Sequence, residues 1–133
     1  MEEQELTKKI IGCAMKVHST LGPGFLESVY QNALAHELDK DGLKTHCEKA
    51  IAVQYDGIIV GDFSADMLVE DKVMLELKAN QALAPANEVQ LVNYLTATGI
   101  EVGLLLNFGA ERLGFKRKSR TYHPKALPKE LIL

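Results

Sequence analysis

Three charged residues, Asp66, Glu76 and Lys78, interrupt two apolar runs that otherwise have the pattern of core strands. Side chains alternate between the two faces of a strand, so Glu76 and Lys78 share a face. Carboxylates are usual protein ligands of magnesium, and a lysine beside such a metal supplies positive charge for a phosphoryl oxygen or an attacking water. A cross-strand salt bridge on a solvated sheet face explains the same pattern, so these residues alone leave both interpretations open.

The spacing between the two runs makes a demand on how they pair. Three residues separate Val69 from Val73, which is a hairpin spacing. If Val69 pairs with Val73 across a three-residue loop, the two acids lie opposite each other on the same face. A two-residue loop would place Asp66 opposite Leu77 with its side chain on the other face, because a shift of one residue reverses every side chain. A site shared with Glu76 therefore requires an odd-length loop or a bulge.

The composition is that of an ordinary soluble globular protein, with 47% hydrophobic and 25% charged residues among 133, and we expect one domain with a sizeable core. The net charge of −3 argues against a protein that coats nucleic acid non-specifically, although a local basic cleft is compatible with it. No apolar run approaches the length that spans a bilayer, and the start MEEQELTKK is unlike a secretory signal. We therefore expect a cytoplasmic protein with no membrane association.

The two cysteines, Cys13 and Cys47, lie far apart in the sequence and form no CxxC or Cys/His spacing. The four histidines form no ligand motif either. We therefore expect buried, reduced thiols rather than a disulfide or a zinc site.

Apolar periodicity and turn residues predict eight elements. These are helices over 2–21, 25–40 and 86–98, and strands over 43–55, 60–69, 73–78, 102–108 and 112–118. The run that contains the second strand begins at residue 58. Val92 and Leu95 are expected to face the core from the third helix. The strand over 102–108 is almost entirely apolar, as expected when both faces are covered. This order indicates an α/β sandwich in which an antiparallel meander is joined through a helix to a further, central strand.

Two polar pairs on the helices add candidate site residues. Glu27 and Tyr30 lie three apart and therefore on one helix face, as do Gln90 and Tyr94 at a spacing of four. A first-turn acid is also favoured by the helix dipole, and a polar pair is common on a solvated face, so both pairs have ordinary structural explanations.

The last expected strand ends in a basic cluster that contains Lys116, Arg117 and Lys118 and extends to Arg120. Such a cluster can hold phosphates, and it equally protects an edge strand from aggregation. Residues 121–133 follow as a tail of uncertain order, so the expected domain covers residues 1–120.

Several stretches resemble one known family. Gly24 to Tyr30 matches the pattern that names the GxxExxY proteins, a branch of the PD-(D/E)XK nuclease-like superfamily. The similarity covers roughly residues 5 to 120, and its stretches follow in the family's order: 18–30, 63–69, 75–79, 90–95 and 103–109. The resemblance implies a restriction-endonuclease-like fold, a mixed β-sheet flanked by helices in α-α-β-β-β-α-β-β order, with the metal site on the central hairpin.

The resemblance also implies roles for the central residues. Asp66 and Glu76 correspond to the metal-binding acids, with the Leu77 carbonyl as a further oxygen ligand, and Lys78 corresponds to the catalytic lysine. The proline that often precedes the first acid is replaced by Ala65, a departure that is common in the superfamily.

The helical residues take supporting roles in the same resemblance. Glu27 corresponds to the acid that some branches contribute from the helix before the sheet. Gln90 and Tyr94 resemble the Gln-x-x-x-Tyr motif of exonuclease-like branches. Gln90 is expected to position the lysine, the water or the nucleic acid, while Tyr94 and Tyr30 are expected to pack against the site or bind a phosphate.

The expected activity is hydrolysis of phosphodiester bonds, most naturally in DNA, with Mg²⁺ or Mn²⁺ as cofactor. Two alternatives stay open. One is a non-catalytic domain that binds nucleic acid or protein, and the other is a subunit active only in a larger assembly. The sequence also leaves open whether the chain forms a homodimer or joins such an assembly.

Overall fold

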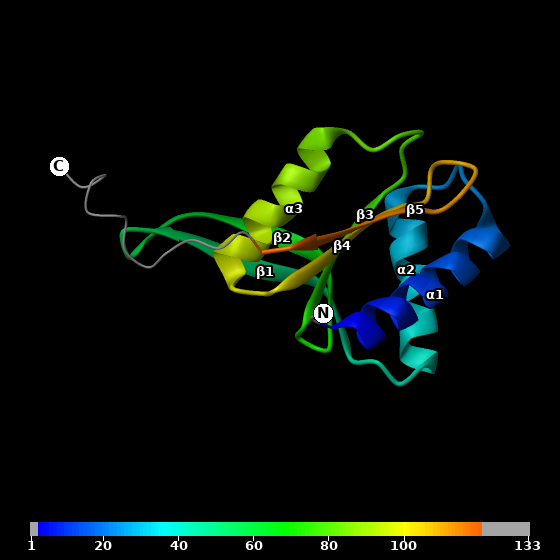
Figure 1. The fold of residues 1–133 in the computed structure, drawn as a ribbon, viewed down its shortest axis with the longest axis horizontal. Helices are drawn as coiled ribbons and strands as arrows, with labels where there is room; N and C mark the ends of the chain where they lie inside the picture. Colours follow the sequence, from blue (N-terminus) through cyan, green and yellow to red (C-terminus); the bar gives the residue numbers. More distant parts are fainter. Residues whose placement is uncertain (1–2, 121–133) are drawn as a thin grey trace.

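The computed structural model describes residues 3–120, so the tail at 121–133 lies outside the described residues (Figure 1). The order of elements is the predicted one. The helices are α1 (Gln4–Leu21), α2 (Glu27–Lys40) and α3 (Pro85–Thr98), and the strands are β1 (Thr45–Tyr55), β2 (Ile58–Val69), β3 (Val73–Lys78), β4 (Val102–Asn107) and β5 (Gly114–Ser119).

The five strands form one mixed sheet in the order β1-β2-β3-β4-β5. The β3–β4 pair is parallel, because α3 carries the chain back between them, and the other three pairs are antiparallel. Every residue of β4 is buried. The predicted meander with a further inner strand is therefore confirmed.

Helices cover both faces of the sheet (Figure 1). The face under α1 and α2 carries the larger apolar core, to which β3 contributes Val73, Leu75 and Leu77. The face under α3 carries a smaller core that includes Met74, Leu91 and Leu95. The alternation of β3 places Glu76 and Lys78 on one face, as the sequence predicted, and the structure shows that this is the face under α3.

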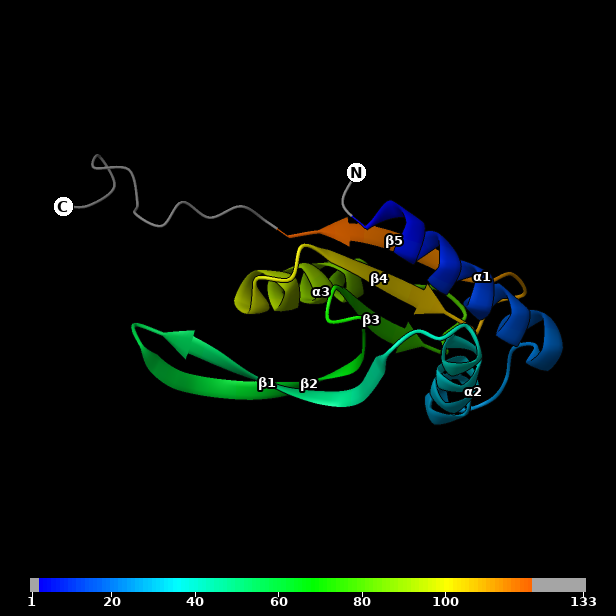
Figure 2. The ribbon, with the colours of Figure 1, turned by 90° about the horizontal axis from the view of Figure 1, so that it is seen from below.

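The β1–β2 hairpin extends well past the rest of the sheet, as Figure 2 shows. β2 pairs with β1 along nearly its whole length but with β3 only over Met67 to Val69. We call this hairpin the arm. Its base pairs with β3, whereas its tip consists of β1 and β2 alone.

Several element bounds and core positions differ from the sequence predictions. α2 begins at Glu27 rather than 25, and Leu26, which precedes it, is 76% exposed. In α3 the fully buried residues are Leu91 and Leu95, while Val92 is only half-buried. Leu91 fits because β4 places Gly103 beneath it: a Cβ at Gly103 would lie 2.9 Å from a Leu91 methyl carbon.

The two cysteines are free, as predicted, but only Cys13 is buried. Cys47 is exposed and lies on β1, one of the two edge strands of the sheet. Among residues 3–120, no helix combines the length and the apolar character that crossing a membrane requires.

Candidate active site

The register of the β2–β3 hairpin is the one that a shared acidic site requires. Val69 pairs with Val73 across a three-residue loop, in which Glu70 and Asp71 have left-handed backbone angles (φ 55° and 56°). The ladder continues only to Met67, and β2 then diverges from β3. Asp66 is the first residue beyond the last pair, so it lies where the two strands separate.

The carboxylate of Asp66 replaces the backbone partner that β3 loses at this point. The backbone N–H of Leu77 donates a hydrogen bond to Asp66 Oδ2 at 2.7 Å. In an antiparallel pair the N–H and C=O of one residue point toward the same neighbouring strand. The Leu77 carbonyl therefore faces the same opening between β2 and β3, beside the acid that its own amide holds in place.

Glu76 is a buried acid with an unsatisfied oxygen. Its side chain is 7% exposed, and Oε1 has no hydrogen-bond partner among the described residues. Burial, the charge of Asp66 and a hydrogen bond with Asp66 together raise the pKa of Glu76 to about 8, and the Lys78 ammonium opposes this rise. A cation between the two acids would offset the repulsion between their charges and would give Glu76 Oε1 the partner that it lacks. The pair therefore fits a divalent metal.

Lys78 ends β3, and the segment that follows it is fixed from β4. Its carbonyl accepts a hydrogen bond from Phe108 N at 2.8 Å. The buried Asn107 side chain accepts from Asn80 N at 3.0 Å and donates to Asn80 O at 2.9 Å. Gly109 has no room for a side chain, because a Cβ there would lie 2.4 Å from the Asn80 backbone. These contacts hold the lysine end of β3 rigidly beside Glu76.

Asn107 and Gly109 were not singled out as site residues from the sequence. Asn107 is nevertheless the only polar residue in the run VGLLLNF, and a polar residue in a strand buried on both faces requires a specific partner. That signal could have identified Asn107, although it could not have identified Asn80 as the partner.

α3 places Tyr94 over the acidic pair. The Tyr94 ring stacks on Phe63 of β2 with centroids 3.6 Å apart and planes 12° from parallel. Burial raises the pKa of Tyr94, with further contributions from the charges of Glu76 and Asp66, and a hydrogen bond with Gln90 opposes the rise. The phenol, the two acids and the Gln90 amide therefore belong to one group of side chains.

Phe63 is a member of this site that the sequence did not single out. It lies on β2 beyond the part that pairs with β3, and Tyr94 stacks on its ring. Its contact with a residue of α3 depends on how the helix packs across the sheet, and no spacing in the sequence encodes that packing.

Tyr30 lies in the core on the other face of the sheet. It is fully buried and stacks on Phe108 at 4.7 Å. Its hydroxyl donates to Gly22 O at 2.6 Å and accepts from Phe25 N at 3.1 Å. Tyr30 therefore packs in the core on the opposite face of the sheet and not against the acids, and its hydroxyl is already engaged and is not free for a phosphate.

Glu27 is the first residue of α2 and is exposed. Within residues 3–120 its side chain makes no hydrogen bond or ion pair, and no three His, Cys, Asp or Glu side chains converge to hold a metal. The structure therefore brings together Asp66 and Glu76 but does not add Glu27 to them. A link between the two regions exists through Phe108, which stacks on Tyr30 and donates its amide to the Lys78 carbonyl.

The basic cluster on β5 is divided between the two faces of the sheet. Arg117 lies beside Thr7 and Ile11 of α1. Lys118 points the other way and forms an ion pair with Glu88 of α3 at 3.0 Å. Lys116 shares the α3 face with Lys118, because side chains alternate along the strand. The three residues consequently do not form one phosphate-binding patch.

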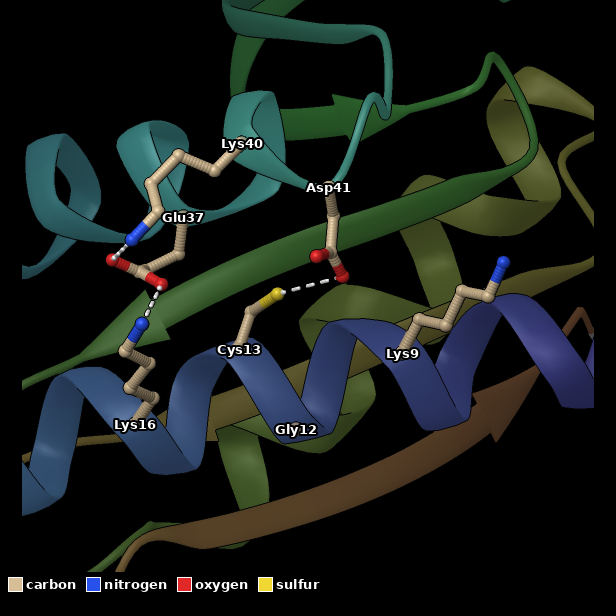
Figure 3. Close-up of a pocket in the computed structure, with 7 residues that line it drawn as sticks. All are labelled: Lys9, Gly12, Cys13, Lys16, Glu37, Lys40 and Asp41. Atoms are coloured by element: carbon tan, nitrogen blue, oxygen red, sulfur yellow. Dashed lines mark hydrogen bonds and ion pairs between the residues drawn. The ribbon is translucent and has the colours of Figure 1, made fainter.

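A surface cavity of about 420 Å³ lies between α1 and α2, away from these residues (Figure 3). Lys16 and Lys40 both pair with Glu37 there, and the Cys13 thiol donates to Asp41 at 3.6 Å. Burial, followed by the nearby Asp41 charge, raises the pKa of Cys13 to about 11, so this thiol stays protonated at neutral pH. The cavity contains none of the predicted site residues, and its charges are largely paired with each other.

Comparisons with known proteins agree with this geometry. A family model described as the PD-(D/E)XK nuclease superfamily matches residues 4–118. No curated protein sequence matches the chain.

Two solved structures share the fold at 16% sequence identity. A crystal structure of a protein named SSO0001 has a TM-score of 0.56 and covers 91% of this chain. An alkaline exonuclease from Laribacter hongkongensis, LHK-Exo, has a TM-score of 0.52 and covers 71% of this chain. The chain spans 61% and 56% of those two proteins, respectively, so each of them is considerably larger.

Proposed function

The chain belongs to the PD-(D/E)XK nuclease superfamily, and on that basis we propose that it is a divalent-metal-dependent nuclease that hydrolyses phosphodiester bonds in DNA. The observation that carries the proposal is the unpartnered, buried Glu76 Oε1 beside the Asp66 carboxylate. Structural roles alone do not explain this arrangement, because an unsatisfied buried acid next to a second acid costs stability.

Asp66, Glu76 and the Leu77 carbonyl are the oxygen ligands that we propose for Mg²⁺ or Mn²⁺. Hard cations prefer such oxygen donors, and two carboxylates leave room for water and a substrate phosphate. The bound metal would polarise the phosphate and lower the pKa of an attacking water. The Leu77 amide keeps Asp66 directed at this position through its 2.7 Å hydrogen bond.

Lys78 is the proposed catalytic cation. It lies on the same strand face as Glu76, and its charge already influences the pKa of that acid. From this position its ammonium would orient the attacking water and offset the negative charge that develops on the phosphate. The contacts of Asn107 and Gly109 with the segment after Lys78 would maintain the lysine's position without reorganisation during the reaction.

Gln90 and Tyr94 form the proposed substrate side of the site. Gln90 is exposed and joined to Tyr94, whose ring is fixed by Phe63. In this arrangement Gln90 would position the water or a phosphate oxygen. We propose Phe63 as a positioning residue, because it contacts Tyr94 rather than the reacting groups.

Several finer assignments form part of the proposal. We propose that the chain belongs to the GxxExxY branch and that DNA is its substrate. We also propose that Glu27 contacts a second metal ion through water. The exonuclease likeness of the fold supports a nucleic-acid substrate. Lys116 and Lys118 lie on the face of the sheet that carries the site, and they are the basic side chains of the cluster that could approach a bound strand.

Metal binding is the first experimental test, because it requires no assumption about the substrate. Isothermal titration of Mn²⁺ and Mg²⁺ into the purified chain should give saturable binding that Asp66→Asn and Glu76→Gln each abolish. Asp62→Asn is the matched control, since Asp62 is an exposed acid on the same strand. Equal binding by all four proteins would refute the assigned ligands.

Hydrolysis is the second test. Linear duplex DNA, single-stranded DNA and RNA should be incubated with each metal, the wild-type chain and Lys78→Ala. Lys72→Ala serves as the control, because Lys72 is an exposed lysine in the hairpin loop. We expect cleavage by the wild type and the control and a loss of at least about 100-fold with Lys78→Ala. Metal binding without cleavage of any substrate would instead support a non-catalytic domain or a subunit of a larger assembly.

A further inference from the structure

His18 is a buried histidine that the proposed reaction does not use. It is 8% exposed and lies in the last turn of α1. Its ring nitrogen Nε2 is 2.8 Å from the carbonyl oxygen of Ala110, in the loop between β4 and β5. A carbonyl oxygen only accepts hydrogen bonds, so Nε2 carries the proton and donates it. α1 is therefore tied to the loop that follows β4.

The three residues before Ala110 all contact the segment 78–80, at the lysine end of β3. The Asn107 side chain exchanges two hydrogen bonds with the backbone of this segment, and the Phe108 amide donates to it at 2.8 Å. Gly109 packs against it too closely for a side chain. Ala110 is the next residue, and its carbonyl is held from α1 instead. Residues 107–110 thus link α1 to the end of β3.

His18 also packs against one of these linking residues. Its ring centroid lies 6.4 Å from that of Phe108, with the planes tilted by 40°. The backbone of His18 is fixed as well, because the N–H of Gly22 donates to its carbonyl at 2.8 Å and ends the helix. A continuous path of hydrogen bonds and packed rings therefore runs from the end of α1 to the carbonyl of Lys78.

A histidine is a costly choice for a position that only fills the core. An apolar side chain would occupy the same space without burying a polar ring. The other buried residues in the second half of α1, which are Cys13, Ala14 and Val17, are apolar or nearly so. The hydrogen bond to Ala110 is the contribution that an apolar residue cannot make, and its direction fixes the loop relative to α1.

We propose that His18 is a positioning residue for the proposed catalytic lysine, an inference that rests on the nuclease activity proposed above. The bond to Ala110 keeps residues 107–110 against the segment 78–80, so Lys78 retains its position during the reaction. A misplacement of about 1 Å can cost about 100-fold in rate, so a loosened loop has a measurable effect. Among the described residues His18 bonds this loop and neither acid, so its loss should leave metal binding intact.

Replacing His18 with glutamine and with asparagine tests the reach of the bond. The glutamine amide nitrogen can take the place of Nε2 and donate to Ala110, whereas asparagine carries the same amide on a side chain one carbon shorter. His18→Leu is a second removal variant, which fills the buried space if the asparagine variant does not fold. We expect His18→Gln to retain kcat. Both removal variants should lower kcat about tenfold or more, with KM and Mn²⁺ affinity unchanged.

Thr7→Val is the matched control for stability. Thr7 is the other buried polar residue of α1, and its hydroxyl donates to the carbonyl of Gln4 at 3.0 Å near the start of the helix. Its replacement should destabilise the protein by removing a buried hydrogen bond on α1, yet leave kcat at the wild-type value. A purely structural role for His18 would give the same result as this control.

A double-mutant cycle with Lys78→Ala tests whether His18 acts through the lysine. In that background His18→Asn should change the residual rate of hydrolysis by less than about twofold, because the side chain that it positions is already gone. A general disturbance of the fold would instead reduce the residual rate by the same factor as it reduces the wild-type rate.

The proposal is overturned if the folded removal variants retain wild-type kcat, or if their full loss persists in the Lys78→Ala background. A wild type that cleaves no substrate would refute the proposed function, and hydrogen exchange then decides the positioning role. The Phe108 amide, which donates to the Lys78 carbonyl, should exchange at least about ten times faster in His18→Asn than in the wild type and in His18→Gln. Equal exchange in all three proteins would also overturn the proposal.

Discussion

Replacing Glu76 with glutamine should stabilise the metal-free protein at neutral and alkaline pH while it abolishes metal binding. Folding raises the pKa of Glu76 from its ordinary value of 4.5 to about 8. Between these two values the native state holds a proton that the unfolded state releases. The free energy of unfolding of the wild type therefore falls as the pH rises through this window.

The size of this effect follows from linkage. One proton retained by the native state corresponds to about 1.4 kcal/mol of stability per pH unit, so Glu76 accounts for a loss on the order of 2–3 kcal/mol between about pH 5.5 and about pH 7.5. Glutamine resembles the protonated acid in shape and carries no charge. The stability advantage of Glu76→Gln over the wild type should therefore grow by about the same amount over that range.

Urea unfolding in the presence of a chelator measures this difference. The wild type, Glu76→Gln and the exposed-acid control Asp62→Asn should be unfolded at intervals across the window, and Asp62→Asn should follow the wild type. Asp66→Asn should reduce the pH dependence only in part, because burial is the largest cause of the Glu76 shift. If the difference between the wild type and Glu76→Gln is constant across the window, Glu76 does not hold the proton and the electrostatic reasoning about the site fails.

Other substitutions test the supports of the site. Gly109→Ala should lower the free energy of unfolding by about 1–3 kcal/mol and reduce hydrolysis, because its methyl group would lie 2.4 Å from the Asn80 backbone. Urea unfolding measures this cost, and a value near zero would mean that the segment around Asn80 shifts to make room. Tyr30→Phe removes the buried hydroxyl bonds and should cost about 1–2 kcal/mol with metal affinity unchanged, and a calorimetric loss of metal binding would assign this tyrosine to the site itself. Cys47 should react with iodoacetamide at pH 8 well before Cys13, since Cys47 is exposed while Cys13 is buried with a pKa of about 11. Peptide mass spectrometry identifies which cysteine is modified first, and earlier modification of Cys13 would contradict this prediction.

Phe63→Leu tests the positioning role proposed for the stack beneath the Tyr94 ring. It keeps an apolar side chain but removes the aromatic partner. We expect lower kcat, because Tyr94 and Gln90 lose their fixed orientation, and unchanged Mn²⁺ affinity, because neither acid is touched. Phe115→Leu is the control. An equal loss of metal affinity and turnover would instead indicate a general disturbance of the hairpin.

Much of the fold was predictable because local signals agreed with each other. All eight elements occur in the predicted order, and β3 has the predicted bounds. Loop length and side-chain alternation, both local properties, limited the β2–β3 hairpin to a small choice of registers. The structure then selected the one with a three-residue loop, which brings Asp66 and Glu76 to one site. The same alternation also separates Arg117 from Lys116 and Lys118.

The chemistry of the site depended on contacts that periodicity does not encode. Burial makes Glu76 a proton-holding acid with an unsatisfied oxygen, and that burial arises from the packing of α3 across the sheet. The Phe63–Tyr94 stack and the Asn107–Asn80 clamp join residues about 30 positions apart. The sequence alone thus determined which residues could bind a metal and on which face they lie. Only the tertiary structure decided their environment, because desolvation and long-range packing are properties of the assembled layers and not of any single strand or helix.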